Sequence, residues 1–211
     1  MRRSLTLLLQ VGRDQRGLAY LEFALIGPIL LFLILGGLEL VNYAMAYLRV
    51  NQISTTVADN AGRVTTGIDE ANLYELFAGA EAIGEPMDFE DNGRVVLSSL
   101  QDNGNSGATH GQMINWQRCW GELDIDSVYG NEDAGRADAT LAQGMGSPSQ
   151  RITSLPGTAV MFVEVTYEYQ PLISDTILPL ADRIRQETAF NVRGQRNNDI
   201  SNTQNLAENS C

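Results

Sequence analysis

The most constraining feature of this sequence is a long apolar segment near its N-terminus. No charged residue occurs from Phe23 to Leu38, and when the segment is extended back to Leu18 only Glu22 interrupts it. A helix of about 20 mostly apolar residues spans a bilayer, whereas a helix in the core of a soluble domain rarely stays apolar on every face over such a length. The sequence therefore predicts a membrane-spanning helix over residues 18–45.

The charges on the two sides of this helix are distributed unequally. The first seventeen residues contain four arginines and one acid: Arg2, Arg3, Arg13, Arg16 and Asp14. The whole chain has a formal net charge of −12, so the part after the helix is strongly acidic. Because basic flanks stay on the cytoplasmic side of a membrane, we expect a cytoplasmic N-terminus and an external C-terminal domain. An acidic domain is a poor match for a phosphate backbone, so we expect no nucleic-acid partner.

The N-terminus also fits an ordinary secretory signal, which has basic, apolar and small-residue regions in that order. Ala44-Met45-Ala46 supplies a small-residue cleavage site, and the mature chain would then begin at Tyr47. Against this interpretation, the apolar region is longer than the roughly 7–15 residues of a typical signal. Glu39 and Asn42 also lie between that region and the site.

A second interpretation starts from Glu22, because a carboxylate at the start of a spanning helix is costly. If the chain is cut after Gly17, Leu18 becomes the N-terminus and Glu22 becomes the fifth residue. The new amine and this carboxylate, on adjacent helices, would then form a strong pair in a low dielectric. Alternatively, Glu22 is solvated among the lipid headgroups.

The segment from Arg13 to Leu48, RDQRGLAYLEFALIGPILLFLILGGLELVNYAMAYL, resembles the N-terminus of TadE-like proteins. These are minor pilins or pseudopilins of tight-adherence (Flp-type) pili. In that family a basic leader ends in Arg-Gly, a short apolar stretch reaches Glu-Phe or Glu-Tyr, and a proline-containing membrane run ends near Gly-x-x-Glu. Those features fall here on Arg16, Gly17, Glu22, Phe23, Pro28, Gly36 and Glu39. The sequence departs from many relatives after Glu39, where Leu40-Val41-Asn42 replaces Gly-Arg.

The resemblance implies cleavage between Gly17 and Leu18 by a prepilin peptidase. It also implies retention in the bacterial inner membrane with the C-terminal domain in the periplasm. The partners would be other minor and major pilin subunits and the pilus assembly platform, with Glu22 as the subunit-pairing carboxylate. Whether the chain enters an extracellular fibre or stays at its base is left open. The alternative function is a membrane-anchored periplasmic binding or adhesion module without a pilus role, which would use the loop Asp124–Pro156.

Helical periodicity continues beyond the membrane segment. An apolar stripe at spacings of three and four predicts an amphipathic helix: Val50, Ile53, Val57, Ala61 and Val64. A second short helix is predicted near Asp69–Ala82. Together these form a helical stem over residues 46–83.

The remainder, residues 84–211, is predicted to be rich in β-structure. Four segments have strand character: Arg94–Leu100, Gln112–Trp120, Ala159–Tyr169 and Ile184–Val192. The third alternates with a period of two and has one mostly polar face. With a cytoplasmic leader at residues 1–17, the sequence predicts an α+β fold: a long N-terminal transmembrane and amphipathic helix followed by a small antiparallel sheet domain with long loops.

The two cysteines, Cys119 and Cys211, have no metal-site spacing and predict a single disulfide in an exported chain. Two unpaired thiols are the alternative. Two long segments, Asp124–Pro156 and Gly194–Ser210, fit no regular structure. Trp116 and Trp120 are expected to pack beside Cys119, although an exposed partner-binding patch is a second interpretation.

No arrangement of residues indicates catalysis, so we expect no enzymatic activity, no cofactor and no metal site. His110 is the only histidine and lies in a Gly- and Asn-rich loop. Asp88 begins half of a calcium loop, but Ser99 stands where a bidentate glutamate is needed. The acids of the long loop are better interpreted as solvated, although they are suitable oxygen ligands for calcium: Asp124, Asp126, Glu132, Asp133 and Asp138.

Overall fold

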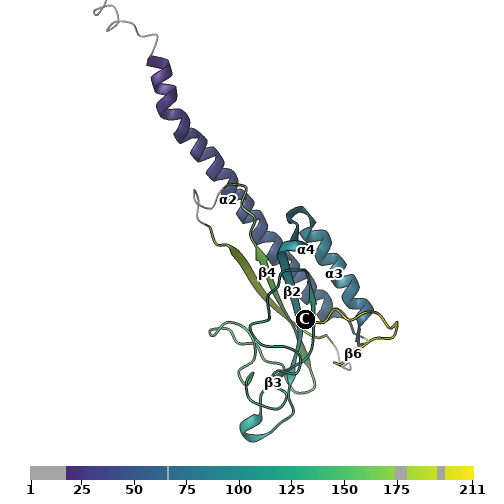
Figure 1. Cartoon of the computed structure of the whole chain (residues 1–211). Coiled ribbons are helices and arrows are strands. Elements are labelled where there is room, and N and C mark those ends of the chain that lie inside the picture. Colours follow the sequence, from purple (N-terminus) through teal and green to yellow (C-terminus); the bar gives the residue numbers. More distant parts are fainter. Residues whose placement is uncertain (1–17, 66, 174–179, 194–197) are drawn as a thin grey trace, which may run out of the picture. The chain divides into compact units, whose positions relative to one another are not determined.

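A computed structural model describes residues 18–65, 67–173, 180–193 and 198–211 (Figure 1). The elements are α2 (Leu18–Arg63), β1 (Ile68–Asp69), α3 (Glu70–Gly84), η2 (Glu85–Met87), α4 (Phe89–Asn92), β2 (Gly93–Asp102), η3 (Gly107–Thr109), β3 (Gln112–Trp120), β4 (Ala159–Glu168), β5 (Arg183–Asn191) and β6 (Ile200–Ser201). The predicted α+β class, with a long N-terminal helix and a small antiparallel sheet, is confirmed. The predicted division into leader, anchor, stem and sheet domain remains a prediction.

The chain forms two compact units. Unit 1 contains residues up to Tyr43 together with Pro171–Pro179, and unit 2 contains Ala44–Gln170 and Leu180–Cys211. Helix α2 has 46 residues and continues from the first unit into the second. Only Pro28 interrupts its backbone donors, so the helical hydrogen-bond ladder extends over almost the whole element.

Within unit 2, α2 buries the predicted apolar stripe. Val50, Ile53, Val57 and Ala61 are fully buried, whereas Val64 lies one residue beyond the helix end at Arg63. Burial of such a stripe is the main source of stability for an amphipathic helix. Helix α3 begins with a reciprocal cap, in which Asp69 Oδ1 accepts from the Ala71 amide and Asn72 Oδ1 accepts from the Asp69 amide.

Four strands form one antiparallel sheet in the order β3-β2-β4-β5. All four were predicted, and the bounds of β3 match the prediction. The outer edge of β3 is occupied by loop and tail backbone: Ile114 exchanges hydrogen bonds with Ala134 and Asp133, and the Cys119 amide donates to Asn209. This edge strand is therefore paired along much of its length.

One face of the sheet packs against the helices (Figure 1). Phe89 of α4 stacks between Trp120 and Tyr167, with ring centroids 5.6 and 5.9 Å away. The hydroxyl of Ser54 in α2 donates to Thr188 at 2.6 Å, which satisfies a polar side chain on the helix-facing side of β5. Stacked aromatic rings and a satisfied hydroxyl therefore stabilise the packing between this face of the sheet and the helices.

The other face of the sheet is covered by the long loop between β3 and β4, so the mostly polar face that was predicted for β4 is not exposed to solvent. Residues 159–167 of that strand are all buried. Leu141 and Met145 of the loop form a second core cluster with Leu100, Ile114, Val160 and Phe162. The loop has no regular structure beyond isolated bridges, as predicted, but it packs as a layer of the domain.

Candidate functional site

The N-terminal part of α2 presents apolar side chains in every direction. Leu25, Leu31, Leu33 and Leu38 are all more than half exposed, and they lie on different faces of the helix. Among the described residues, one helix, Tyr20–Arg63, has the length and the apolar composition needed to cross a bilayer. An exposed apolar surface of this extent needs lipid or protein around it.

The predicted cleavage boundary has two residues. Gly17 lies outside the described residues, and Leu18 is the first residue of α2. Glu22 lies in the second turn of α2 with an exposed side chain. The pairing role of this carboxylate and the cleavage therefore remain predictions.

A second acid of α2, Glu39, has a defined partner within unit 1. Its side chain is only 1% exposed, and its Oε2 accepts a hydrogen bond from the backbone amide of Ile173 at 2.9 Å. These residues are 134 positions apart in the sequence. No local pattern predicts this contact, although Glu39 itself stands out as the acid that ends the apolar run.

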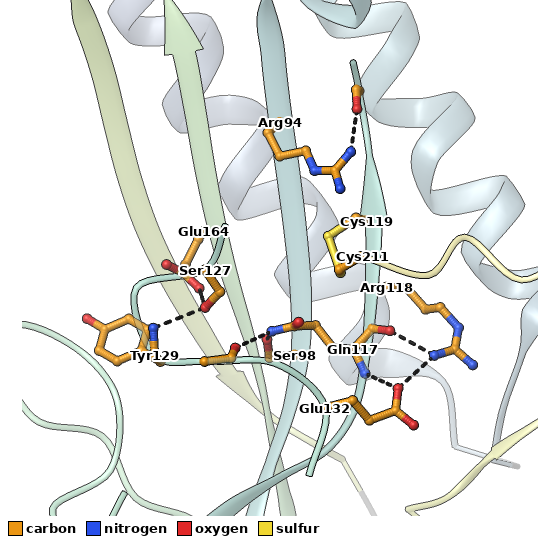
Figure 2. Close-up of a disulfide and its surroundings, with 12 residues drawn as sticks. Arg94, Ser98, Gln117, Arg118, Cys119, Ser127, Tyr129, Glu132, Glu164 and Cys211 are labelled. Carbon is orange, nitrogen blue, oxygen red and sulfur yellow. Dashed lines mark hydrogen bonds and ion pairs between the residues drawn. A yellow bond between two sulfur atoms is a disulfide. The ribbon is translucent and has the colours of Figure 1, made fainter. Parts of the chain in front are cut away.

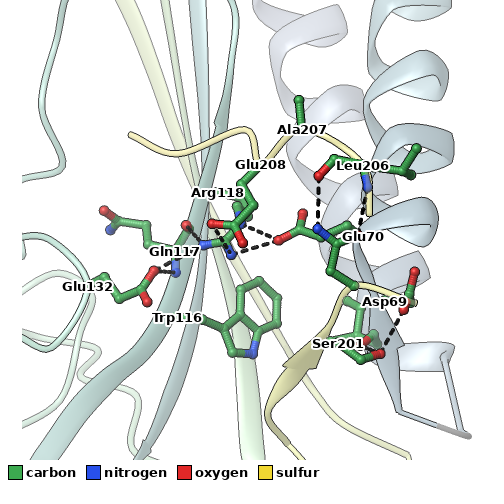
Figure 3. Close-up of polar contacts among 12 residues, drawn as sticks. Asp69, Glu70, Trp116, Gln117, Arg118, Glu132, Ser201, Leu206, Ala207 and Glu208 are labelled. Atoms are coloured by element: carbon green, nitrogen blue, oxygen red, sulfur yellow. Dashed lines mark hydrogen bonds and ion pairs between the residues drawn. The ribbon is translucent and has the colours of Figure 1, made fainter. Parts of the chain in front are cut away.

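Unit 2 contains a buried ion pair between α3 and β3 (Figure 3). Both Nε and Nη2 of Arg118 lie 2.7 Å from Glu70 Oε1, and the two side chains are 5% and 1% exposed. Glu132 from the long loop and Glu208 from the tail lie 3.0 and 3.5 Å from the same guanidinium. Burial lowers the pKa of Arg118, but the hydrogen bond and charge of Glu70, with the other two acids, outweigh it and raise the pKa.

The C-terminal tail is fastened beside this pair by a disulfide (Figure 2). Cys119 of β3 is bonded to Cys211, 92 positions later, so the predicted pairing is present in the structure. Trp116 is 1% exposed and donates from Nε1 to the carbonyl of Asn198. Trp120 stacks on Phe89, so both tryptophans pack within the domain as the first interpretation expected.

The tail is also held at the start of α3 (Figure 3). Asp69 accepts hydrogen bonds from the Thr203 amide at 2.9 Å and the Ser201 hydroxyl at 2.8 Å. Together with the bond from the Ala71 amide, these donors hold the pKa of Asp69 at about 2. The Tyr74 hydroxyl donates to the carbonyl of Ala207, so the tail connects the helix, the sheet edge and the disulfide.

On the opposite face, two glutamates tie the long loop to the sheet, and Figure 2 shows the first of them, Glu164, beside Ser127. Glu164 accepts from the Ser127 hydroxyl and the Val128 amide, and Glu187 accepts from the Tyr129 hydroxyl at 3.0 Å. Arg185 lies between the two acids, 2.7 Å from Glu164 and 2.6 Å from Glu187. Burial raises the pKa of Glu164, although the bonds from the loop act in the opposite direction.

A groove of about 790 Å³ opens beside these glutamates. Its walls include Tyr129, Arg151, Arg185 and Glu187 together with loop backbone around Gly144. This volume is in the range of small-molecule sites. The groove mixes both signs of charge with apolar surface and does not by itself select a class of ligand.

The described residues contain no group of three or more His, Cys, Asp or Glu side chains arranged to hold a metal ion. His110 is exposed and its Nδ1 lies 3.0 Å from the carbonyl of Asn105. Asp133 pairs with Arg136 at 2.6 Å. The segment that begins at Asp88 forms the short helix α4 and the start of β2, so its acids are not arranged as a calcium loop.

Residues 17–59 match the family model described as TadE-like protein. The match covers the exposed apolar part of α2 and most of the stripe that packs in unit 2, and it includes Glu22 and Glu39. No curated protein and no solved structure matches the chain. Over residues 17–59, this chain is therefore similar to the TadE-like family.

Proposed function

We propose that this chain is a minor pilin or pseudopilin, a structural or assembly component of a tight-adherence pilus, with no catalytic role. The observation that carries the proposal is the charge-free run Phe23–Leu38, exposed around α2 and preceded by Glu22, within a TadE-like segment. A helix of this kind serves as a membrane anchor and as a surface for packing against other subunit helices.

The orientation follows from charge and from the cysteines. Arginines before the anchor favour a cytoplasmic N-terminus in the inner membrane, with unit 2 in the periplasm. The disulfide between Cys119 and Cys211 is compatible with that oxidising compartment. The partners are a prepilin peptidase, other pilin subunits and the assembly platform.

Processing provides the first test. We expect the protein extracted from membranes to begin at Leu18, because cleavage after Gly17 frees the amine that would pair with Glu22 of a neighbour. Intact mass and N-terminal sequencing measure this directly. Gly17→Leu should leave the leader attached, whereas Gly36→Ala, at a glycine with open space around it, should be processed normally. A native protein that starts at Met1 or at Tyr47 would overturn the proposal.

The pairing role of Glu22 provides a second test. Two unit charges about 4 Å apart attract by roughly 4 kcal/mol at an effective dielectric of about 20, before desolvation is subtracted. Glu22→Ala and Glu22→Gln should therefore insert normally in carbonate-washed membranes but lose most incorporation with partner subunits, measured by co-purification and filament counts. The glutamine variant keeps the size of the side chain and removes only its charge. Full piliation in both variants would assign Glu22 to the headgroup region.

The second candidate is an anchored periplasmic binding or adhesion module. The groove beside Arg151 and Glu187 favours it, because the loop that forms the groove is packed and could present a fixed binding surface. The two candidates differ at the N-terminus: a binding module needs the anchor but not a cut after Gly17. An uncleaved, functional chain would favour the module.

A further inference from the structure

The connection between β4 and β5 returns to the anchor. Three of its residues, Pro171, Leu172 and Ile173, belong to unit 1 together with the N-terminal part of α2. The Ile173 amide donates to Glu39 at 2.9 Å, and the Leu172 side chain is 69% exposed. A short apolar segment is therefore hydrogen-bonded to the anchor helix with a leucine facing outward.

The depth of this contact follows from helix geometry. Glu22 and Glu39 flank the charge-free run, and a rise of 1.5 Å per residue places them about 25 Å apart along α2. The hydrocarbon layer of a bilayer is about 30 Å thick. If α2 spans the membrane, the two acids mark its two boundaries, and Glu39 lies at the outer one. The segment bonded to Glu39 then lies at that boundary as well.

The chemistry of the contact suits that position. A carboxylate at the edge of the hydrocarbon needs a donor, and a backbone amide there needs an acceptor, because lipid offers neither. The Glu39–Ile173 bond satisfies both groups. The neighbours of Glu39 in the sequence that are exposed, Leu38, Leu40 and Val41, are apolar, and so is Leu172 next to Ile173.

We propose that Pro171–Ile173 is a second membrane contact, inserted into the outer boundary of the bilayer and positioned by Glu39. The lipid surface is the partner, because this segment is bonded to the turn of α2 where the lipid-facing run ends. The proposal rests on the anchor role of α2. It goes beyond that role because it attaches the β4–β5 connection, and not only the N-terminal helix, to the membrane.

The test places an environment-sensitive dye at single positions of the full chain in phosphatidylcholine–phosphatidylglycerol vesicles, with the native disulfide verified by mass. At Leu172→Cys we expect blue-shifted emission, loss of fluorescence with a spin label near the headgroup, and protection from aqueous iodide. Leu31→Cys, in the middle of the anchor, should be quenched more by a spin label deep in the acyl chains. Leu155→Cys, equally exposed but in unit 2, is the matched control and should be quenched by iodide.

The quenching results distinguish the anchor role of α2 from the second membrane contact at Pro171–Ile173. If the dye at position 172 is quenched by iodide and not by lipid while the dye at position 31 is quenched by lipid, the anchor stands and the second contact is wrong. If position 31 is also quenched only by iodide, the anchor itself fails. A dye at position 172 protected from both quenchers is covered by protein, which also overturns the lipid contact.

The role of Glu39 is tested in the same labelled chain. Glu39→Gln keeps an oxygen that accepts from the Ile173 amide, whereas Glu39→Ala removes it. We expect iodide quenching at position 172 to rise in the alanine variant and to stay unchanged in the glutamine variant. Equal quenching in both variants and in the parent would show that Glu39 does not position the segment.

Discussion

Arg118→Met is expected to destabilise unit 2 by about 3–5 kcal/mol, because it leaves Glu70 charged, buried and without its partner. Glu70 is 1% exposed, and its second oxygen, Oε2, already has no hydrogen-bond partner among the described residues. Urea unfolding of the full chain in detergent, followed by tryptophan fluorescence, measures the loss. Both tryptophans lie in unit 2, so the signal reports on this domain.

Two control variants test whether the loss of stability comes from breaking a buried ion pair. Arg136→Met removes a half-exposed arginine that pairs with Asp133, and such surface pairs contribute about 0–1 kcal/mol. The double variant Arg118→Met with Glu70→Leu should recover most of the lost stability, since replacing a buried pair by apolar residues is often neutral. An Arg118→Met midpoint no lower than that of Arg136→Met would show that the pair is not isolated from water.

Removing the disulfide is the second large effect. Cys211→Ser is expected to lower the free energy of unfolding by about 4–5 kcal/mol, because the disulfide closes a loop of 92 positions and reduces the conformational entropy of the unfolded chain. Domains of this size have total stabilities of about 5–15 kcal/mol, so the variant should unfold at much lower urea concentration. Amide hydrogen exchange should also rise in the tail and at the Cys119 amide of β3, which donates to the carbonyl of Asn209 in the tail.

The neighbouring substitution Ser210→Ala serves as the matched control and should leave the midpoint unchanged. Reduction of the native protein should lower its midpoint to that of Cys211→Ser and should not affect the variant. If the oxidised protein and Cys211→Ser have the same urea midpoint, the hydrogen bonds of Asp69 and Tyr74 are sufficient to hold the tail without the disulfide.

Local patterns predicted most of the elements. Helices α2 and α3 and all four long strands were predictable because each depends on a run or a period within about ten to twenty residues. The Cys119–Cys211 bond was also predictable, since two cysteines allow only one pairing within the chain. The burial of β4 on both faces was not predicted, because the alternation of Glu164 and Thr166 with apolar residues does not show that a loop covers them.

The burial of these polar residues has a physical cause. Glu164 is buried because Ser127, Val128 and Arg185 supply its partners, and two of these lie in a loop without periodicity. The Glu70–Arg118 pair and the Glu39–Ile173 bond are likewise contacts between residues far apart in the chain. A single sequence shows that such acids exist but not which donors will reach them.

The occupied outer edge of β3 has a consequence for how copies of this protein can meet. Strand-by-strand growth into a fibril requires two free flanks on every copy, one to accept and one to donate. Here the backbone hydrogen bonds with Ala134, Asp133 and Asn209 already occupy much of one flank. Edge pairing through β5 alone would therefore stop at two molecules, and a longer assembly needs a surface other than the edges of this sheet.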